Sequence, residues 1–467
     1  MNDRDSLRGV DRVHLIGAGG IGVSALAPAL LARGCTVSGS DPASNAVTER
    51  LKEMGVTIYH EHAAEHINGV DLVVATSAAP PDNPERKAAE AAGVPVWARA
   101  RMLGALVNEK RGIVASGAHG KTTLTAMLTH VFLGLGEDPS AYIGGDVRQL
   151  GGNSLLGKGE WAIAEGDESD GSFIYLKPEI ALVNNIDADH LDHYEGINDI
   201  IEQFELFLAG VHKDGWILTS ADCKYTRKLN LPNGPKRLTY GFAEDADICG
   251  TNYYANARGW GCDVVVRGEM RGPMRLQISG RCHTHNALGV LAAVEAAGLS
   301  IEKAMESLKT FEGVQRRMEE KGCVRGVTVV DDYAHHPNEI RATIQGLRDR
   351  YRNRLIGVFQ PHLYSRTLKL LDDFGRSFTG LDLVVLTDIY AAREQPVAGV
   401  SGEALLQPTR NNGSPALYIP QHDEAVNFLC SETHDGDVVV TMGAGDVWKL
   451  GDQLLERLRE AKAEAVR

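Results

Sequence analysis

A glycine-rich turn at residues 117–123 has the residue types and spacing of a phosphate-binding loop. It reads G-A-H-G-K-T-T, follows an apolar run and opens a helical pattern. Backbone amides in such a turn can cradle phosphates, Lys121 can reach the β and γ groups, and a threonine hydroxyl can hold Mg²⁺. The turn therefore predicts binding of a nucleoside triphosphate. The residues expected to contact it are Gly117, His119, Gly120, Lys121, Thr122 and Thr123.

Acidic residues follow two later apolar runs, at residues 165–170 and 187–192. Parallel sheets place their ligands at the carboxyl ends of strands. Because Mg²⁺ keeps several waters and takes only one or two carboxylates, most of these acids cannot be ligands. We favour Glu165 and His190 as the metal-associated pair. The loop caps or solvated charges are expected to be Asp167, Asp187 and Asp192.

A second glycine turn lies near the N-terminus, at residues 17–22. It reads G-A-G-G-I-G, and Asp41 ends the next strand-like run. Glycines there permit a tight turn and let a phosphate approach the amides at a helix N-terminus. Asp41 stands about where a ribose-binding acid stands in a dinucleotide fold. Taken alone, this turn fits NAD, a UDP-sugar or a plain strand–helix connection.

The elements that must position these motifs follow an α/β pattern. Strand-like runs alternate with helical stretches almost throughout, which is typical of parallel sheets. Three segments begin with strands of their own, near Val13, Gly112 and Val327. We predict three domains, at residues 1–109, 110–314 and 315–467.

Size, charge and cysteine usage narrow the class of protein. A chain of 467 residues predicts about three domains. The net charge of −14 argues against a non-specific nucleic-acid binder. Seven dispersed cysteines without a C-x-x-C pair are typical of reduced thiols. The N-terminus has no apolar signal core, and no run approaches the length of a membrane span. We expect a cytoplasmic protein that binds neither nucleic acid nor membrane.

These motifs, with three later ones, resemble the Mur ligase family. The later motifs are Asn286 ahead of a helical stretch at 287–297, G-V-Q-R-R at 313–317 and D-D-Y-A-H-H-P at 331–337. They occur in the family's order across all three segments. The resemblance implies an α/β fold of three domains: a Rossmann-like N-terminal domain that binds UDP, a central P-loop ATPase and a Rossmann-like C-terminal domain.

Within the family, the chain is similar to the branch that adds L-alanine to the lactyl carboxylate of UDP-N-acetylmuramate. The features are the first glycine turn, the 331–337 motif, Q-P-H-L-Y-S-R-T at 360–367 and M-G-A-G-D at 442–446. The resemblance implies a peptidoglycan-precursor ligase that uses ATP and Mg²⁺ and forms an acyl phosphate. The expected partners are UDP-N-acetylmuramate and L-alanine, and the expected assembly is a monomer or homodimer.

The resemblance also implies roles for individual residues. The catalytic residues would be Lys121, His190, Arg317, His335 and Arg366. Besides the turn at 117–123, ATP would be contacted by Asn286, Arg317 and Asp332. The metal would be held by Thr122, Glu165 and His190. The substrates would be contacted by Gly19, Gly20, Ile21, Ser40, Asp41, Tyr333, His335 and Arg366.

The sequence departs from the pattern of the family or of its relatives at three places. The family's H-N-x-x-N reads C-H-T-H-N at 282–286, so only Asn286 is matched securely. Leu363 stands where some relatives have Arg, which leaves one fewer cation for a substrate carboxylate. No lysine lies between Lys177 and Lys213, where relatives that add later amino acids carry a modified lysine. Its absence favours the alanine-adding branch.

Three other functions are weighed against this one. A recycling ligase that joins a tripeptide to UDP-N-acetylmuramate would share the three-domain plan, but we expect a different motif at 360–367. An NAD-dependent oxidoreductase leaves the turn at 117–123 unexplained. A P-loop regulatory protein would need neither His335 nor Arg366. For the ligase, closure of the domains around the reactants is expected, because the acyl phosphate must be kept from water.

Overall fold

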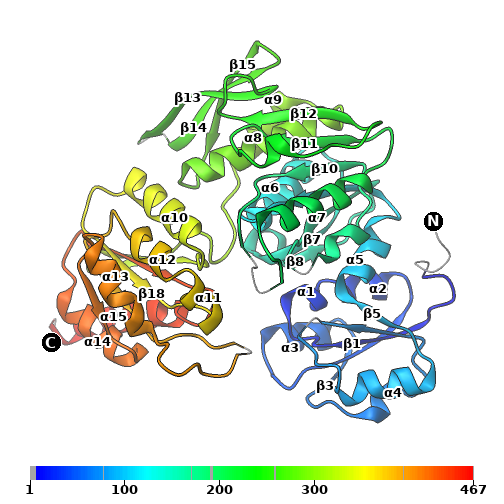
Figure 1. The fold of residues 1–467 in the computed structure, drawn as a ribbon, viewed down its shortest axis with the longest axis horizontal. Helices are drawn as coiled ribbons and strands as arrows, with labels where there is room; N and C mark the ends of the chain where they lie inside the picture. Colours follow the sequence, from blue (N-terminus) through cyan, green and yellow to red (C-terminus); the bar gives the residue numbers. More distant parts are fainter. Residues whose placement is uncertain are drawn as a thin grey trace. The chain divides into compact units, whose positions relative to one another are not determined.

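The computed structural model describes residues 7–76, 78–169, 171–189, 193–256, 259–392 and 394–465. The chain divides into two compact units. The first comprises Met1–Asn252, Asp263–Met274 and His285–Phe311, and the second Tyr253–Cys262, Arg275–Thr284 and Glu312–Arg467. The elements form three sheets, coloured from blue through green to red along the chain in Figure 1.

The first sheet is entirely parallel, in the order β3-β2-β1-β4-β5. Its strands are β1 (Arg12–Ile16), β2 (Thr36–Ser40), β3 (Thr57–Tyr59), β4 (Leu72–Ala75) and β5 (Val96–Ala98). Its helices are α1 (Ile21–Ser24), α2 (Ala27–Ala32), α3 (Ala46–Glu53), η2 (Ala64–Ile67), α4 (Pro84–Ala92) and α5 (Arg99–Val107). The strand order reverses between β1 and β4. Such sheets bind ligands at this switch point, and the first glycine turn leaves β1 there.

The second sheet has ten strands in the order β15-β14-β13-β12-β11-β10-β6-β9-β7-β8. The central strands are β6 (Arg111–Ser116), β9 (Trp161–Gly166), β10 (Ile180–Val183), β11 (Trp216–Ser220) and β12 (Lys236–Gly241). The others are β7 (Ser140–Val147), β8 (Gly152–Leu155), β13 (Ile248–Asn256), β14 (Gly259–Val266) and β15 (Glu269–Leu276). The helices are α6 (Lys121–Gly134), α7 (Ile197–Ala209), α8 (Arg281–Ala296) and α9 (Ile301–Leu308), with short turns η3 (Arg148–Leu150), η4 (Ser172–Tyr175) and η5 (Thr226–Lys228). The apolar strands β6 and β10 are buried because helices such as α6 pack on the sheet.

The third sheet has the order β16-β17-β21-β18-β19-β20. Its strands are β16 (Glu319–Val324), β17 (Val327–Asp332), β18 (Leu355–Phe359), β19 (Leu383–Leu386), β20 (Ala416–Tyr418) and β21 (Val438–Met442). Only the pairing of β16 with β17 is antiparallel among these neighbours. The helices are α10 (Pro337–Arg350), α11 (Tyr364–Lys369), α12 (Leu371–Ser377), η6 (Gly402–Leu405), α13 (Leu406–Asn411), α14 (His422–Glu432) and α15 (Trp448–Ala465).

The predicted α/β class is confirmed, and one boundary is corrected. The sequence predicted a helix that starts after Asn286, but α8 starts at Arg281, so Asn286 lies in its second turn. The preceding Gly280 has φ +111° and separates the helix from β15, while residues 281–285 carry no helix breaker. In the part of the chain that the structure describes, no helix is long and apolar enough to cross a membrane.

Candidate active site

The turn at 117–123 connects the end of β6 to the start of α6. Gly117 has φ +139° and Gly120 φ +81°, conformations that glycine adopts without steric strain. A Cβ on Gly120 would also lie 3.0 Å from Asn184 Nδ2. The side chain of Asn185 makes two hydrogen bonds to the backbone of the turn. Its Oδ1 accepts from the His119 amide at 2.8 Å, and its Nδ2 donates to the His119 carbonyl at 2.9 Å. The loop is therefore shaped by its glycines and by two asparagines that follow β10.

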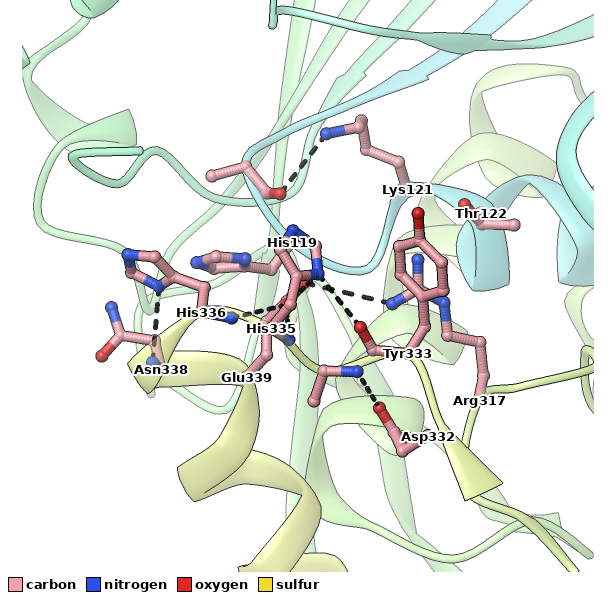
Figure 2. A network of polar contacts seen from close by, with 12 residues as sticks. His119, Lys121, Thr122, Arg317, Asp332, Tyr333, His335, His336, Asn338 and Glu339 are labelled. Carbon is pink, nitrogen blue, oxygen red and sulfur yellow. Dashed lines mark hydrogen bonds and ion pairs between the residues drawn. The ribbon is translucent and has the colours of Figure 1, made fainter. Parts of the chain in front are cut away.

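Lys121 opens α6 and forms an ion pair with Glu168. Its Nζ lies 2.7 and 3.0 Å from the two carboxylate oxygens, and it also donates to the Ala118 carbonyl at 3.3 Å. Figure 2 shows Lys121 beside His119 and Thr122. Burial lowers the pKa of Lys121, but the charges of Glu168, Asp167 and Glu165 outweigh that effect and raise it. The ammonium group is therefore charged at any physiological pH.

Thr122 and Glu165 form a pair of oxygen donors beside this lysine. The Thr122 hydroxyl donates to Glu165 Oε1 at 3.1 Å, and the Gly144 amide donates to Oε2 at 2.8 Å. Burial raises the pKa of Glu165, and the nearby positive charge of Lys121 opposes that change. A carboxylate and a hydroxyl are hard ligands of the kind that Mg²⁺ takes, so these residues fit the predicted metal. Thr123, the other candidate threonine, is 3% exposed.

Asn286 contacts the same loop from α8. Its Oδ1 accepts a hydrogen bond from Asn184 Nδ2 at 2.9 Å, and Tyr240 donates to Asn184 Oδ1 at 2.9 Å. Asn286 is 3% exposed, and its amide lies near the Cα of Gly120. The secondary structure that brings Asn286 here is the first half of α8.

A cavity of about 280 Å³ joins the first glycine turn to the acidic end of β9 within the first unit. Its lining includes Gly20, Ile21, Arg99, Glu165 and Asp167. The two sides are tied together by the side chain of Asn153, which donates to the Ile21 carbonyl at 2.6 Å. Two predicted substrate residues and one predicted metal ligand therefore share one cavity.

The two other predicted substrate residues, Ser40 and Asp41, lie at the end of β2 beside the first glycine turn. The Gly19 amide donates to Asp41 Oδ2 at 2.9 Å, and Ala43 donates to Asp41 Oδ1 at 2.9 Å. Asp41 thus fixes the turn against the loop that follows β2. Ser40 is fully buried, and its hydroxyl donates to Glu85 at 2.7 Å.

A second group of predicted site residues lies at the end of β17 in the second unit (Figure 2). Asp332 is 5% exposed, and its carboxylate accepts hydrogen bonds from the amides of Met318 and Ala334 at 2.8 and 2.7 Å. Burial raises the pKa of Asp332 to about 6. The Arg317 guanidinium lies 5.0 Å from the ring centre of Tyr333, a cation–π contact.

The two histidines that follow Tyr333 differ in their contacts. His335 Nδ1 lies 3.0 Å from the Tyr333 carbonyl and 3.3 Å from Glu339 Oε2. Both partners are acceptors, so Nδ1 carries a proton, and Nε2 is the basic atom of the neutral ring. His336 instead caps α10, where its Nδ1 accepts from the Asn338 amide at 3.4 Å. Of the two, only His336 serves as a helix cap.

Arg366 lies on α11, which follows a strained residue. Its Nη1 is 3.3 Å from His362 Nδ1. Leu363, one turn earlier, is buried at φ +69°, which is a costly conformation for a leucine. The His362 ring stacks on Tyr390, with ring centres 5.9 Å apart.

Sequence reasoning missed several polar residues of these sites. Glu168 pairs with Lys121, Arg99 lines the cavity, and Asn184 and Asn185 hold the loop. The run of acids at 165–170 did signal Glu168, whereas nothing local distinguishes Arg99 from other surface arginines. Of the three acids expected to be loop caps or solvated charges, Asp167 accepts a hydrogen bond from the Ser169 amide, and Asp187 lies 3.0 Å from His119 Nε2. His190 and Asp192 lie outside the described residues.

Comparisons with known proteins cover almost the whole chain. The model described as Mur ligase family, catalytic domain, matches residues 12–111; that of the Mur ligase middle domain matches residues 115–294; and that of the Mur ligase, glutamate ligase domain, matches residues 316–445. The chain is 41% identical to a UDP-N-acetylmuramate–L-alanine ligase of Pelotomaculum thermopropionicum, over 96% of this chain and 98% of that protein. It is 42% identical to the enzyme of that name from Desulfosudis oleivorans, over 95% and 97%.

Solved structures are similar over the same length. The UDP-N-acetylmuramate-alanine ligase MurC of Thermotoga maritima superimposes with a TM-score of 0.82 at 26% identity, covering 96% of this chain and 99% of that one. A murein peptide ligase of Psychrobacter arcticus has a TM-score of 0.70 at 24% identity, with the same coverage. At 24% identity, the similarity to the murein peptide ligase shows the fold alone.

Proposed function

Because the chain belongs to the Mur ligase family, we propose that it joins L-alanine to the lactyl carboxylate of UDP-N-acetylmuramate in peptidoglycan precursor synthesis. The observation that carries this proposal is the similarity of about 40% identity, over nearly full length, to ligases of that name. The chain is thus an ATP-dependent, amide-bond-forming enzyme of this family.

ATP is proposed to bind at the turn of residues 117–123. The helix α6 starts at Lys121 without a side-chain cap on its first amides, a helix N-terminus favours phosphate, and Lys121 supplies a fixed positive charge. Asn286, beside the loop, is proposed to contact the adenine, and Asp332 to accept a hydrogen bond from the nucleotide ribose. We propose that Thr122, Glu165 and His190 hold Mg²⁺. When bound, Mg²⁺ neutralises charge on the phosphate oxygens.

UDP-N-acetylmuramate is proposed to use the cavity between Gly20, Ile21, Arg99 and Glu165. The diphosphate is proposed to lie at the start of α1, which follows the first glycine turn and has no side-chain cap, and Asp41, which holds the Gly19 amide, is proposed to accept a ribose hydroxyl. The lactyl carboxylate would then lie toward Glu165, at the end where the γ-phosphate is delivered.

The reaction has two steps. A carboxylate is a poor acyl donor because its leaving group would be oxide, so its oxygen first attacks the γ-phosphorus and ADP leaves. Lys121 and Arg317 stabilise the charge that spreads over the transferred phosphoryl group. The alanine amine then attacks the acyl carbon, and inorganic phosphate leaves as the amide forms.

His335 is proposed to accept the proton that the alanine nitrogen loses in the second step. Its Nδ1 is protonated toward two acceptors, so Nε2 has the lone pair. Arg366 and Tyr333 are proposed to orient the amino acid, with the guanidinium paired to its carboxylate.

Phosphate release from ATP tests the substrate assignment. The enzyme is supplied with UDP-N-acetylmuramate and either L-alanine or the tripeptide L-Ala-D-Glu-diaminopimelate. Release with alanine alone supports the proposal. Release only with the tripeptide would mean that the chain is a recycling ligase, and an absorbance change with NADH in place of ATP would mean an oxidoreductase.

We also propose a cytoplasmic location and a monomeric or homodimeric assembly for the protein. All seven cysteines are free thiols, as expected of a protein in the reducing cytoplasm. The expected monomer or homodimer stays a prediction, which sedimentation equilibrium at micromolar concentration checks.

A further inference from the structure

Three histidines surround one buried carboxylate, that of Glu85, beside the first sheet. Glu85 Oε1 lies 3.3 Å from His14 Nε2 and 2.8 Å from His66 Nδ1. Glu85 Oε2 accepts a hydrogen bond from Ser40 at 2.7 Å and lies 2.8 Å from His62 Nδ1. Burial alone raises the pKa of Glu85, but hydrogen bonds from His14, His66 and Ser40 outweigh it and lower it to about 2. The carboxylate is therefore ionised.

Three of these donor atoms are spaced as metal ligands. His14 Nε2, His66 Nδ1 and a Glu85 carboxylate oxygen all lie within 4.8 Å of one another. Nitrogen and oxygen ligands bound at about 2.0–2.2 Å around a tetrahedral ion lie roughly 3.3 Å apart. The distances of Glu85 Oε1 to the two histidine nitrogens, 3.3 and 2.8 Å, are close to that spacing. They come from three different elements, β1, η2 and α4, so an ion there would cross-link the fold.

Neighbouring residues orient these side chains as they do around protein-bound metals. His14 Nδ1, the nitrogen on the far side of its ring, lies 2.8 Å from Ser38 Oγ. A metal-binding histidine commonly uses its second nitrogen in this way. The His66 ring stacks on Tyr59, with centres 3.8 Å apart and planes 10° apart. The side chains of His14 and Glu85 are 0% exposed, whereas that of His62 is 28% exposed and opens the cluster to solvent.

We propose that His14, His66 and Glu85 bind one divalent transition-metal ion of the zinc class. Two imidazoles and one carboxylate, with a further position for water, are a donor set that suits Zn²⁺. The nitrogen ligands distinguish it from the oxygen donors Thr122 and Glu165, which suit Mg²⁺. On binding, the proton on His66 Nδ1 moves to Nε2, which frees Nδ1 for the ion.

The site lies next to the predicted nucleotide turn. Ser40 donates to Glu85, and the following residue, Asp41, accepts from the Gly19 amide. A metal that holds Glu85 would therefore fix the strand end that carries Asp41. This structural role requires no participation of the ion in the ligation reaction.

Metal titration of the tag-free, full-length protein tests the site. The protein is stripped with EDTA, saturated with Mg²⁺ and titrated with Zn²⁺ against a chromophoric chelator, with stoichiometry measured by plasma mass spectrometry. We expect one tight Zn²⁺ per chain. In His66→Asn, which keeps a hydrogen-bond donor but loses the ligand, we expect affinity to fall more than about 100-fold, because losing an outer partner alone costs roughly 10–100-fold.

His60→Asn is the matched control. His60 is an exposed histidine six residues away, whose Nε2 lies 3.0 Å from Lys52 Nζ, so its loss should leave Zn²⁺ binding unchanged. Equal binding by wild type and His66→Asn, or no tight binding by either, overturns the proposal. If His66→Asn does not fold, Co²⁺ bound to the wild type decides. Intense visible bands of a four- or five-coordinate ion support the site, and only weak six-coordinate bands refute it.

Discussion

At the scale of single residues, Lys121, which is proposed to bind the phosphates, already has an anionic partner. Glu168, 2% exposed, holds the Lys121 ammonium where phosphates are proposed to bind. ATP carries more negative charge than one carboxylate, so it can replace Glu168 as the partner without a change in the protonation of Lys121. The ion pair with Glu168 compensates the buried charge of Lys121 when no nucleotide is bound.

Replacing Lys121 should greatly lower the rate of the first chemical step, the phosphoryl transfer. We expect Lys121→Met to lower kcat by about 10²–10³-fold, the usual effect of removing one preorganised charge from a transition state. Alanine-dependent phosphate release measures this. Lys158→Met, at an exposed position of the same unit, is the control and should keep wild-type kcat. A Lys121→Met enzyme within threefold of wild type would refute the role of the lysine.

Arg366 is expected to act on the amino acid and not on ATP. Loss of a charged hydrogen bond of about 1.5–3 kcal/mol predicts that Arg366→Ala raises KM for alanine, or lowers kcat, by roughly 10–100-fold. ATP binding, measured by fluorescence with a nucleotide analogue, should persist. Arg376→Ala, an exposed arginine of α12, controls for general loss of positive charge. Unchanged kinetics in Arg366→Ala would exclude a substrate role.

At the scale of elements, the strand–turn–helix unit β6–α6 depends on two glycines for different reasons. Gly117 and Gly120 both have positive φ, but a Cβ on Gly117 would meet the backbone of Asn185 at 3.0 Å, whereas one on Gly120 would meet the side-chain amides of Asn184 and Asn286 at 3.0–3.3 Å. Asn184, after β10, and Asn286, in α8, therefore leave no room for a side chain at Gly120 in the turn at 117–123. A longer loop would have more amides, but this short one is completed by side chains from neighbouring elements.

Two alanine substitutions separate backbone strain from loop contact. Gly120→Ala and Gly136→Ala both place a Cβ at positive φ, and each should lower the free energy of unfolding by about 1–2 kcal/mol. Only Gly120 has neighbours within 4 Å of that Cβ, so only Gly120→Ala should also weaken ATP binding. Urea unfolding and nucleotide titration measure the two effects. Equal ATP affinity in both variants would contradict the proposed contact between the loop and phosphates.

At the scale of the whole molecule, the first unit brings two sheets to one cavity. Arg99 at the start of α5 lies 3.8 Å from Asp167 and lines the space beside Gly20 and Glu165. A cation between the turn proposed to bind the diphosphate and a carboxylate is suited to a substrate that carries negative charge at both ends.

Arg99→Ala should therefore weaken binding of the nucleotide sugar. We expect its KM for UDP-N-acetylmuramate to rise about 10-fold or more, with KM for ATP changed far less, since a charged hydrogen bond is lost. The matched control is Arg101→Ala, on the same helix, whose guanidinium lies 4.3 Å over Trp97. Identical KM values in Arg99→Ala and the control would show that the cavity is not the sugar-nucleotide site.

The sequence determined the chemistry of this protein because the relevant motifs are local. The turns at 17–22 and 117–123 join a strand to a helix within a few residues, so spacing alone predicted their phosphate-binding shape. The α/β class followed from the alternation of runs, and the alanine-adding function followed from the resemblance of four motifs to one branch of the Mur ligase family. The three domain boundaries and the roles of individual residues remain predictions.

Only the tertiary structure decided which distant side chains complete those motifs. Asn184 and Asn286 reach the loop from β10 and α8, and Arg99 shares a cavity with Glu165, although 66 residues separate them. The histidines around Glu85 likewise come from separate elements, and their spacing in sequence matches no metal motif. Such groupings depend on sheet order and helix packing, which bring together residues that no local pattern relates. The sequence determined the reactive groups, and packing determined their partners.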